Sequence, residues 1–110
     1  MLKEIYFGNV THSEHTKVKI QKEITKISSH LNTSKHSLFE VWLRKNKKVN
    51  SSIYECSIKL NYFGDVYFVM KRNINLYKSI SLARRTMAKI IKKKHNRNTF
   101  KHTTNNQLAG

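Results

Sequence analysis

A stripe of apolar side chains along residues 75–95 constrains the fold more than any other feature of this sequence. The side chains recur at steps of three and four, as on one face of a helix, and they are Leu76, Tyr77, Ile80, Ala83, Met87, Ile90 and Ile91. A shorter stripe predicts a helix over residues 14–31, with Ser13 as its N-cap. Its members are Ile20, Ile24, Ile27 and Leu31. Each helix therefore has one apolar face, which needs a second layer to pack against.

Strand patterns before and between the helices supply that layer. Residues 53–62 alternate between a polar face and an apolar face, and the apolar face holds Tyr54, Cys56, Ile58 and Leu60. Further strands are expected at residues 2–7, 38–45 and 66–72, with turns at 46–52 and 63–65. The order β-α-β-β-β-α predicts an α+β, two-layer α/β sandwich, in which a four-stranded sheet carries two helices packed on one face.

The chain length of 110 residues suits one domain with one modest core. We expect this domain at residues 1–97, with the last helix ending near His95 and a polar, disordered tail at 98–110. No apolar run approaches the roughly 20 residues of a membrane span, and the N-terminus has no signal-peptide pattern. The single cysteine, Cys56, rules out an internal disulfide and is expected in the core rather than as a nucleophile. These features predict a cytoplasmic protein.

The formal net charge of +16 is the strongest indication of function. All six acids lie in residues 1–65, which have a net charge of +5, whereas residues 66–110 contain no acid and have a net charge of +11. A compact domain this basic repels itself unless a polyanion neutralises it. Nucleic acid is the first candidate. An anionic membrane surface is a weaker one, because the basic faces lack the large apolar side chains that interfacial helices use.

The basic side chains of the last helix gather opposite its apolar stripe. Helical geometry places Lys78, Arg85, Lys89 and Lys92 in one band, with Arg84 and Lys93 at its edges and Lys94 near the helix end. Solvated helix faces normally mix charges of both signs, since like charges at close spacing destabilise a helix. The absence of acids therefore favours binding of a polyanion over simple solvation. Lys19, Lys22 and Lys26 repeat the pattern on the first helix.

The sequence offers no set of residues for catalysis or for a metal. The six histidines are scattered, the acids are few, and the three glycines form no phosphate-binding loop. We therefore expect a binding protein that is not an enzyme and has no metal or cofactor. Five aromatic side chains could stack on bases or fill the core, and they are Phe39, Trp42, Tyr54, Tyr67 and Phe68. For Trp42 we favour packing in the core.

The start of the last helix carries a resemblance to a known family. Residues 75–81 read NLYKSIS, and the basic helix LARRTMAKIIKKKHNR follows. The chain resembles the ribosome hibernation-promoting factors, also called ribosome-associated inhibitors or ribosomal subunit interface proteins. In that family the segment typically reads Asp-Met/Leu-Tyr-Ala-Ala-Ile-Asp. Tyr77 and Ile80 match, whereas Asn75 and Ser81 replace the family's acids. The resemblance covers about residues 1–97 and includes the hairpin at 53–72 and the opening IYFGNV.

The resemblance implies a function as well as a fold. Members bind the small ribosomal subunit in the channel for mRNA and tRNA, contact its rRNA, and keep ribosomes idle under stress or in stationary phase. The fold also resembles a double-stranded RNA-binding domain, which reads RNA by shape and backbone. The match of the last helix implies rRNA contacts at Lys78, Arg84, Arg85, Lys89, Lys92, Lys93 and Lys94, with weaker candidates at Lys22 and Lys26. The short chain without an acidic tail is similar to the promoting type.

Two questions stay open at this point. The first concerns the basic residues around the 46–52 turn, which are Arg44, Lys45, Lys47 and Lys48. The sequence does not decide whether they contact a second phosphate track or form an ordinary solvated hairpin loop. The alternative function is a small module that binds structured RNA off the ribosome. In either case we expect no membrane or small-molecule partner and a monomer when the protein is free.

Overall fold

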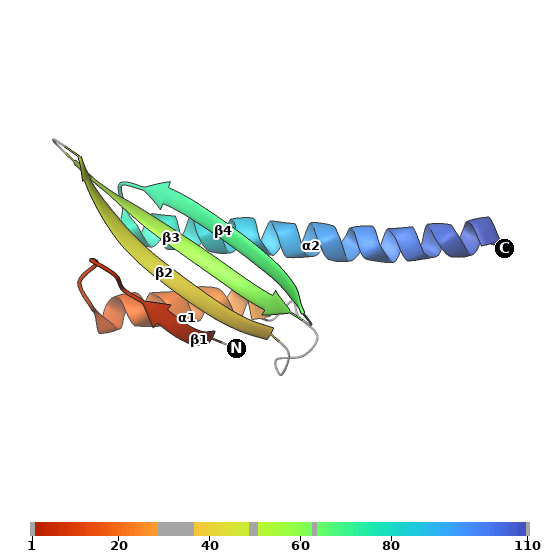
Figure 1. The fold of residues 1–110 in the computed structure, drawn as a ribbon, viewed down its shortest axis with the longest axis horizontal. Helices are drawn as coiled ribbons and strands as arrows, with labels where there is room; N and C mark the ends of the chain where they lie inside the picture. The colour runs from red at the N-terminus through yellow and green to blue at the C-terminus, as the bar shows by residue number, and fades with distance from the viewer. Residues whose placement is uncertain (1, 29–36, 49–50, 63, 110) are drawn as a thin grey trace.

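The computed structural model describes residues 2–28, 37–48, 51–62 and 64–109. Its elements follow the predicted order. They are β1 (Leu2–Tyr6), α1 (Glu14–Ser28), β2 (Ser37–Lys48), β3 (Ser51–Tyr62), β4 (Asp65–Asn73) and α2 (Leu76–Ala109). The four strands form one sheet in the order β1-β2-β3-β4, and the helices pack on it (Figure 1).

The sheet is mixed. β1 and β2 run parallel and are joined through α1, whereas β2, β3 and β4 form antiparallel pairs. A parallel pair needs such a crossover, and a helix supplies it while covering one face of the sheet. α2 packs on β3 and β4 and also contacts α1. The prediction of a two-layer α+β fold is therefore confirmed.

The core lies between the sheet and the two helices. Alternate residues of the strands point into it, and the helices add the apolar side chains of their predicted stripes. The fully buried members include Phe39, Val41, Ile58, Leu60, Ile20, Ile27, Ile80, Ala83 and Met87. Cys56 is also buried, as predicted, and burial raises the pKa of its thiol to about 12. Tyr77 and Ile90 are exposed, because the predicted stripe is wider than the strip of α2 that contacts the sheet.

Both helices begin at a capping residue, Ser13 for α1, as predicted, and Asn75 for α2. The Ser13 carbonyl accepts a bond from the Lys17 amide, and its hydroxyl lies 3.5 Å from the Thr16 amide. The Asn75 side chain accepts from the Lys78 amide at 3.2 Å and begins α2. A side-chain oxygen at this position satisfies an amide that has no partner inside the helix. Local sequence therefore determines where both helices start.

Two boundaries differ from the sequence prediction. β2 and β3 continue through most of the expected turn at 46–52 and pair as far as Lys48 and Ser51, because cross-strand pairing outweighs the polar composition there. The predicted helix end near His95 is wrong, since α2 continues to Ala109. Residues 96–109 contain no proline or glycine that would end a helix. The division into a domain at 1–97 and a tail at 98–110 stays a prediction.

The predicted helix residues 29–31, with Leu31, lie outside the described residues. Within the described part of the chain, no helix is both long enough and apolar enough to cross a membrane. α2 is long, but the exposed side chains described on it are strongly basic. The helix extends well beyond the sheet (Figure 1).

Among the described residues, no helix or strand covers the face of the sheet opposite the helices (Figure 1). Strand alternation places Trp42 on this open face, because its neighbours Val41 and Leu43 point into the core. The prediction that Trp42 packs in the core is therefore wrong. Its ring instead stacks on Tyr6 of the neighbouring strand, with centroids 5.2 Å apart. Phe68 also lies on the open face and is exposed.

Candidate nucleic-acid interface

The outer side of α2 presents a row of exposed cations. Lys78, Arg85, Lys89, Lys92 and Lys93 all have exposed side chains, and α2 contains no acid that could pair with them. One straight helix holds them, and its buried stripe fixes its orientation on the sheet. We call these five residues the α2 basic row. A rigid row of cations at helical spacing can contact successive phosphates without reading bases.

The other predicted contact residues differ in their surroundings. Lys22 and Lys26 lie on α1 with exposed side chains. Arg84 is different, because only 19% of its side chain is exposed and it turns toward α1. Lys94 belongs to α2, but its side chain is outside the described part of the structure. The two helices therefore contribute to one layer of basic side chains on the same side of the sheet.

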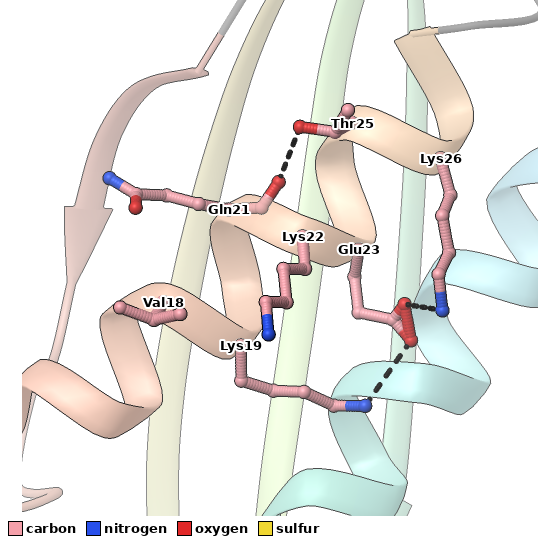
Figure 2. Close-up of a pocket in the computed structure, with 7 residues that line it drawn as sticks. All are labelled: Val18, Lys19, Gln21, Lys22, Glu23, Thr25 and Lys26. Atoms are coloured by element: carbon pink, nitrogen blue, oxygen red, sulfur yellow. Dashed lines mark hydrogen bonds and ion pairs between the residues drawn. The ribbon is translucent and has the colours of Figure 1, made fainter.

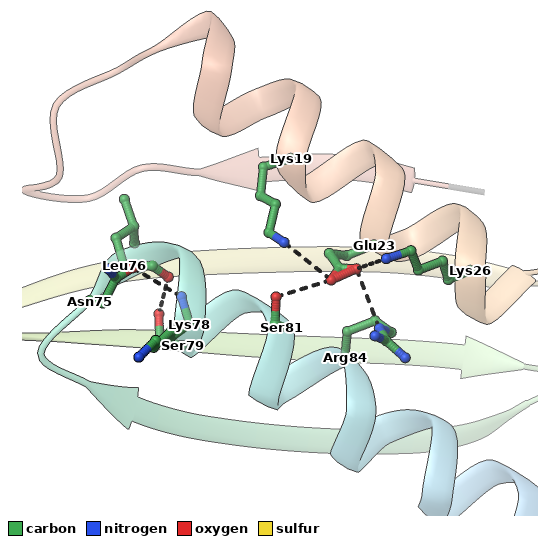
Figure 3. A network of polar contacts seen from close by, with 9 residues as sticks. All are labelled: Lys19, Glu23, Lys26, Asn75, Leu76, Lys78, Ser79, Ser81 and Arg84. Carbon is green, nitrogen blue, oxygen red and sulfur yellow. Dashed lines mark hydrogen bonds and ion pairs between the residues drawn. The ribbon is translucent and has the colours of Figure 1, made fainter.

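A buried carboxylate joins the two helices at the centre of this layer. Glu23 of α1 has a side chain that is 2% exposed, and its carboxylate accepts a bond from Ser81 Oγ of α2 at 3.1 Å (Figure 3). Three cations surround the same carboxylate: Lys19 Nζ at 3.4 Å, Lys26 Nζ at 3.3 Å and Arg84 Nε at 3.4 Å. The Arg84 contact is an ion pair without hydrogen-bond geometry. We call Glu23 and these four partners the Glu23 cluster.

The cluster holds Glu23 in its charged form. Burial opposes ionisation of the carboxyl group, but the hydrogen bonds from Lys26 and Ser81 and the charges of Lys19 and Arg84 outweigh it. The pKa of Glu23 therefore lies below its ordinary value. One negative charge surrounded by three positive charges leaves an excess of two, so the cluster links the helices and still adds to the positive layer.

Sequence reasoning missed the roles of Glu23, Lys19 and Ser81. The spacing of Lys19 and Lys26 relative to Glu23 is that of i,i+4 and i,i+3 helix pairs, which sequence alone can recognise. The contacts of Glu23 with Ser81 and Arg84 connect residues about 60 positions apart, and no local pattern announces them. As a result, Arg84 lies at the interface between α1 and α2, and not at the edge of the outer basic band that the sequence predicts.

A shallow hollow of about 400 Å³ lies along α1 beside the cluster (Figure 2). Its walls combine the apolar Val18 with polar and charged side chains of the same helix, namely Lys19, Gln21, Lys22, Glu23, Thr25 and Lys26. Three lysines thus border one depression, next to the single acid that they outnumber. The hollow extends the basic layer from α2 onto α1.

The end of the β2–β3 hairpin is a separate basic region. Arg44 and Lys47 are exposed there, and Lys45 Nζ lies 5.8 Å from the centre of the Tyr54 ring. The side chain of Lys48 is outside the described residues. These residues belong to the sheet and not to the helices, so the structure does not join them to the α2 basic row.

Comparisons with known proteins support the fold. No protein-family model matches the sequence, and no curated protein matches it either. Among solved structures, the Protein Y N-terminal domain from Thermus thermophilus aligns with a TM-score of 0.72 at 14% identity, over 84% of this chain and 96% of that one. A ribosomal subunit interface protein from Coxiella burnetii aligns with a TM-score of 0.73 at 12% identity, over 87% and 99%.

The chain has the fold of the Protein Y N-terminal domain. The alignments include nearly the whole of both solved chains and more than four fifths of this one, so the likeness extends over most of the fold and is not a local motif. The predicted fold of the ribosomal subunit interface proteins is therefore confirmed. At such low identity the likeness concerns the backbone, and the chemistry must come from the side chains of this chain.

Proposed function

We propose that this protein is a translation inhibitor that binds rRNA of the small ribosomal subunit in the mRNA and tRNA channel. In this proposal it keeps ribosomes idle under stress or in stationary phase, acts in the cytoplasm, and is not an enzyme. The observation that carries the proposal is the α2 basic row, five exposed cations on an acid-free helix, on the fold of a ribosomal subunit interface protein.

The physical chemistry of the row fits folded RNA. Phosphates in folded rRNA form tracks on the surface of A-form helices, and proteins read such tracks through backbone and shape. A rigid helix loses little entropy when its side chains contact a track, because the core already fixes its orientation. Each neutralised phosphate releases counterions, so binding should weaken steeply as salt rises. Lys22, Lys26 and the α1 hollow would extend the same contact.

The experiment is co-sedimentation of the purified protein with ribosomes at low and at moderate salt, together with translation in an extract. We expect the protein to travel with small subunits or whole ribosomes at low salt and to inhibit translation. The variant Arg85→Gln with Lys89→Gln removes two charges from the α2 basic row and should weaken binding at least tenfold.

A matched control separates the site from the total charge. Lys59→Gln with Lys71→Gln removes the same two charges from the sheet, and binding should change less than threefold. Equal losses in both variants would mean that net charge, and not the row, drives binding. A protein that stays at the top of the gradient at low salt but binds structured RNA would support the alternative of an RNA-binding module off the ribosome.

A further inference from the structure

The open face of the sheet gathers exposed apolar side chains. Among the described residues, five of the nine exposed large hydrophobic side chains lie there. They are Tyr6, Leu38, Val66, Phe68 and Met70, and the half-buried Trp42 lies beside Tyr6. Phe68 is 59% exposed and Val66 is 58% exposed, so both side chains reach into solvent.

The charges on this face differ from those on the helices. The described residues of the open face include three carboxylates and three cations, which are Glu4, Glu40, Glu55, Arg44, Lys59 and Arg72. One pair is already closed, because Arg72 Nε donates to Glu55 Oε1 at 2.7 Å. The charges of these described side chains thus sum to zero, in a chain of net charge +16. A polyanion gains little from such a face, whereas a second copy of the chain meets no local excess of like charge there, and only the net charges of the two chains repel.

The strand register makes the face complementary to itself. β2 and β3 occupy the centre of the sheet, and Glu40 pairs in register with Lys59, Trp42 with Ser57, and Arg44 with Glu55. A two-fold axis parallel to the strands and between β2 and β3 places each β2 residue over its β3 partner of the other copy. Glu40 of one copy then meets Lys59 of the other, Arg44 lies over the Glu55–Arg72 pair, and the large Trp42 ring meets the small Ser57.

The area of the face fits a stable dimer. The exposed fractions of its apolar side chains amount to on the order of 500 Å² of accessible surface. A standard interface buries about 800 Å² per partner, of which a little over half is apolar. The apolar side chains of this face together with its charged residues match that size and composition.

We infer that the open sheet face is the interface of a symmetric dimer, in which two copies pack sheet against sheet. Aligned packing of two sheets, with their strands running in nearly the same direction, is a common arrangement. In this dimer both helix layers point outward, since they lie on the opposite face of each sheet. The basic rows of the two copies are therefore far apart and stay accessible. This inference departs from the expectation of a monomer, and it concerns the protein at high concentration.

The test is sedimentation velocity of the nucleic-acid-free protein over a range of concentrations, at 0.15 M and 0.5 M NaCl. The mass should rise from 13.0 kDa toward twice that value. The dimer should strengthen at the higher salt, because salt screens the repulsion between two basic chains. Contaminating RNA that bridged two copies would give the opposite dependence. A monomer at every concentration and both salts would overturn the inference.

Variants of exposed residues identify the face without threatening the core. Phe68→Thr with Met70→Thr keeps strand-forming residues on β4 and should weaken the dimer at least tenfold. The matched control is Ile74→Thr with Val18→Thr, which removes similarly exposed apolar side chains outside the open face and should leave the dimer unchanged. Circular dichroism confirms that each variant is folded. Equal weakening in both variants contradicts an interface at this face.

A charge exchange tests the two-fold axis itself. Glu40→Lys places two like charges together at the proposed interface and should weaken the dimer several-fold. Adding Lys59→Glu restores opposite charges across the axis and should recover the dimer. No recovery would mean that the two sheets meet in another register. Because these measurements contain no RNA, their failure would leave the proposed ribosome binding untouched.

Discussion

Arg84 of α2 lies against Glu23 of α1, with Nε 3.4 Å from Oε2, and both side chains are largely withdrawn from solvent (Figure 3). The pair ties together two helices that the sequence places far apart. Two adjacent arginines therefore have different surroundings: Arg84 contacts α1 at the helix interface, whereas Arg85 is exposed. The basic layer therefore contains side chains with structural roles as well as candidate RNA contacts.

Glu23→Gln should destabilise the protein by about 1–3 kcal/mol. The amide keeps the shape and can still accept from Ser81, but Lys19, Lys26 and Arg84 then repel one another without a carboxylate between them. Urea unfolding measures the loss. Glu14→Gln is the control, since this exposed acid in the first turn of α1 contributes about 0.5 kcal/mol through the helix dipole. Equal losses of stability in the two variants would mean that the Glu23 cluster contributes no more than an exposed acid at a helix start.

The stability of the protein should fall with acid partly through Glu23. Its pKa is lowered in the folded state, so the unfolded chain, with a value of about 4.3, binds the proton more readily. The contribution of Glu23 is complete above that unfolded value and is lost as the pH falls through the lower, folded value. The stability difference between wild type and Glu23→Gln should therefore shrink below about pH 4. A constant difference between pH 7 and pH 3 would contradict this mechanism.

Neighbouring arginines should respond differently to the same substitution. Arg84→Gln should cost about 1–2 kcal/mol of stability, because it leaves part of the buried Glu23 charge unpaired. Arg85→Gln should leave stability unchanged within about 0.5 kcal/mol. It should weaken RNA binding several-fold and lower the slope of log K against log salt by about one. Urea unfolding and salt titration with ribosomes measure both effects, and the reverse pattern would contradict the assignment.

Gly8→Ala should destabilise the fold by about 2–3 kcal/mol. Gly8 has a φ of +58°, and an added Cβ would lie 2.7 Å from the Leu43 carbonyl oxygen, which belongs to the backbone and cannot turn away. Gly64→Ala is the matched control, because its φ is +85° but no atom lies within 4 Å of the added Cβ. It should cost only about 1 kcal/mol, the backbone strain alone. Thermal or urea unfolding compares the two variants.

The sequence by itself determined the elements and their order. The alternation along β3, the apolar stripes of both helices and the caps at Ser13 and Asn75 are local patterns with the periods of strand and helix. They sufficed for the two-layer fold, for the burial of Cys56 and for the exposed cations of α2. Local patterns carry this information because each depends on residues only a few positions apart.

Only the tertiary structure decided which side chains stay exposed on each face of the sheet and which distant residues contact one another. Local periodicity separates the two faces of β2 but does not say which apolar side chains stay uncovered, and so Trp42 was assigned to the core although it lies on the open face. Likewise, the position of Arg84 depends on how α1 crosses α2, which brings Glu23 within reach across 61 positions of sequence. Contacts of this kind arise from the packing of distant elements, which the spacing of residues along the chain does not encode.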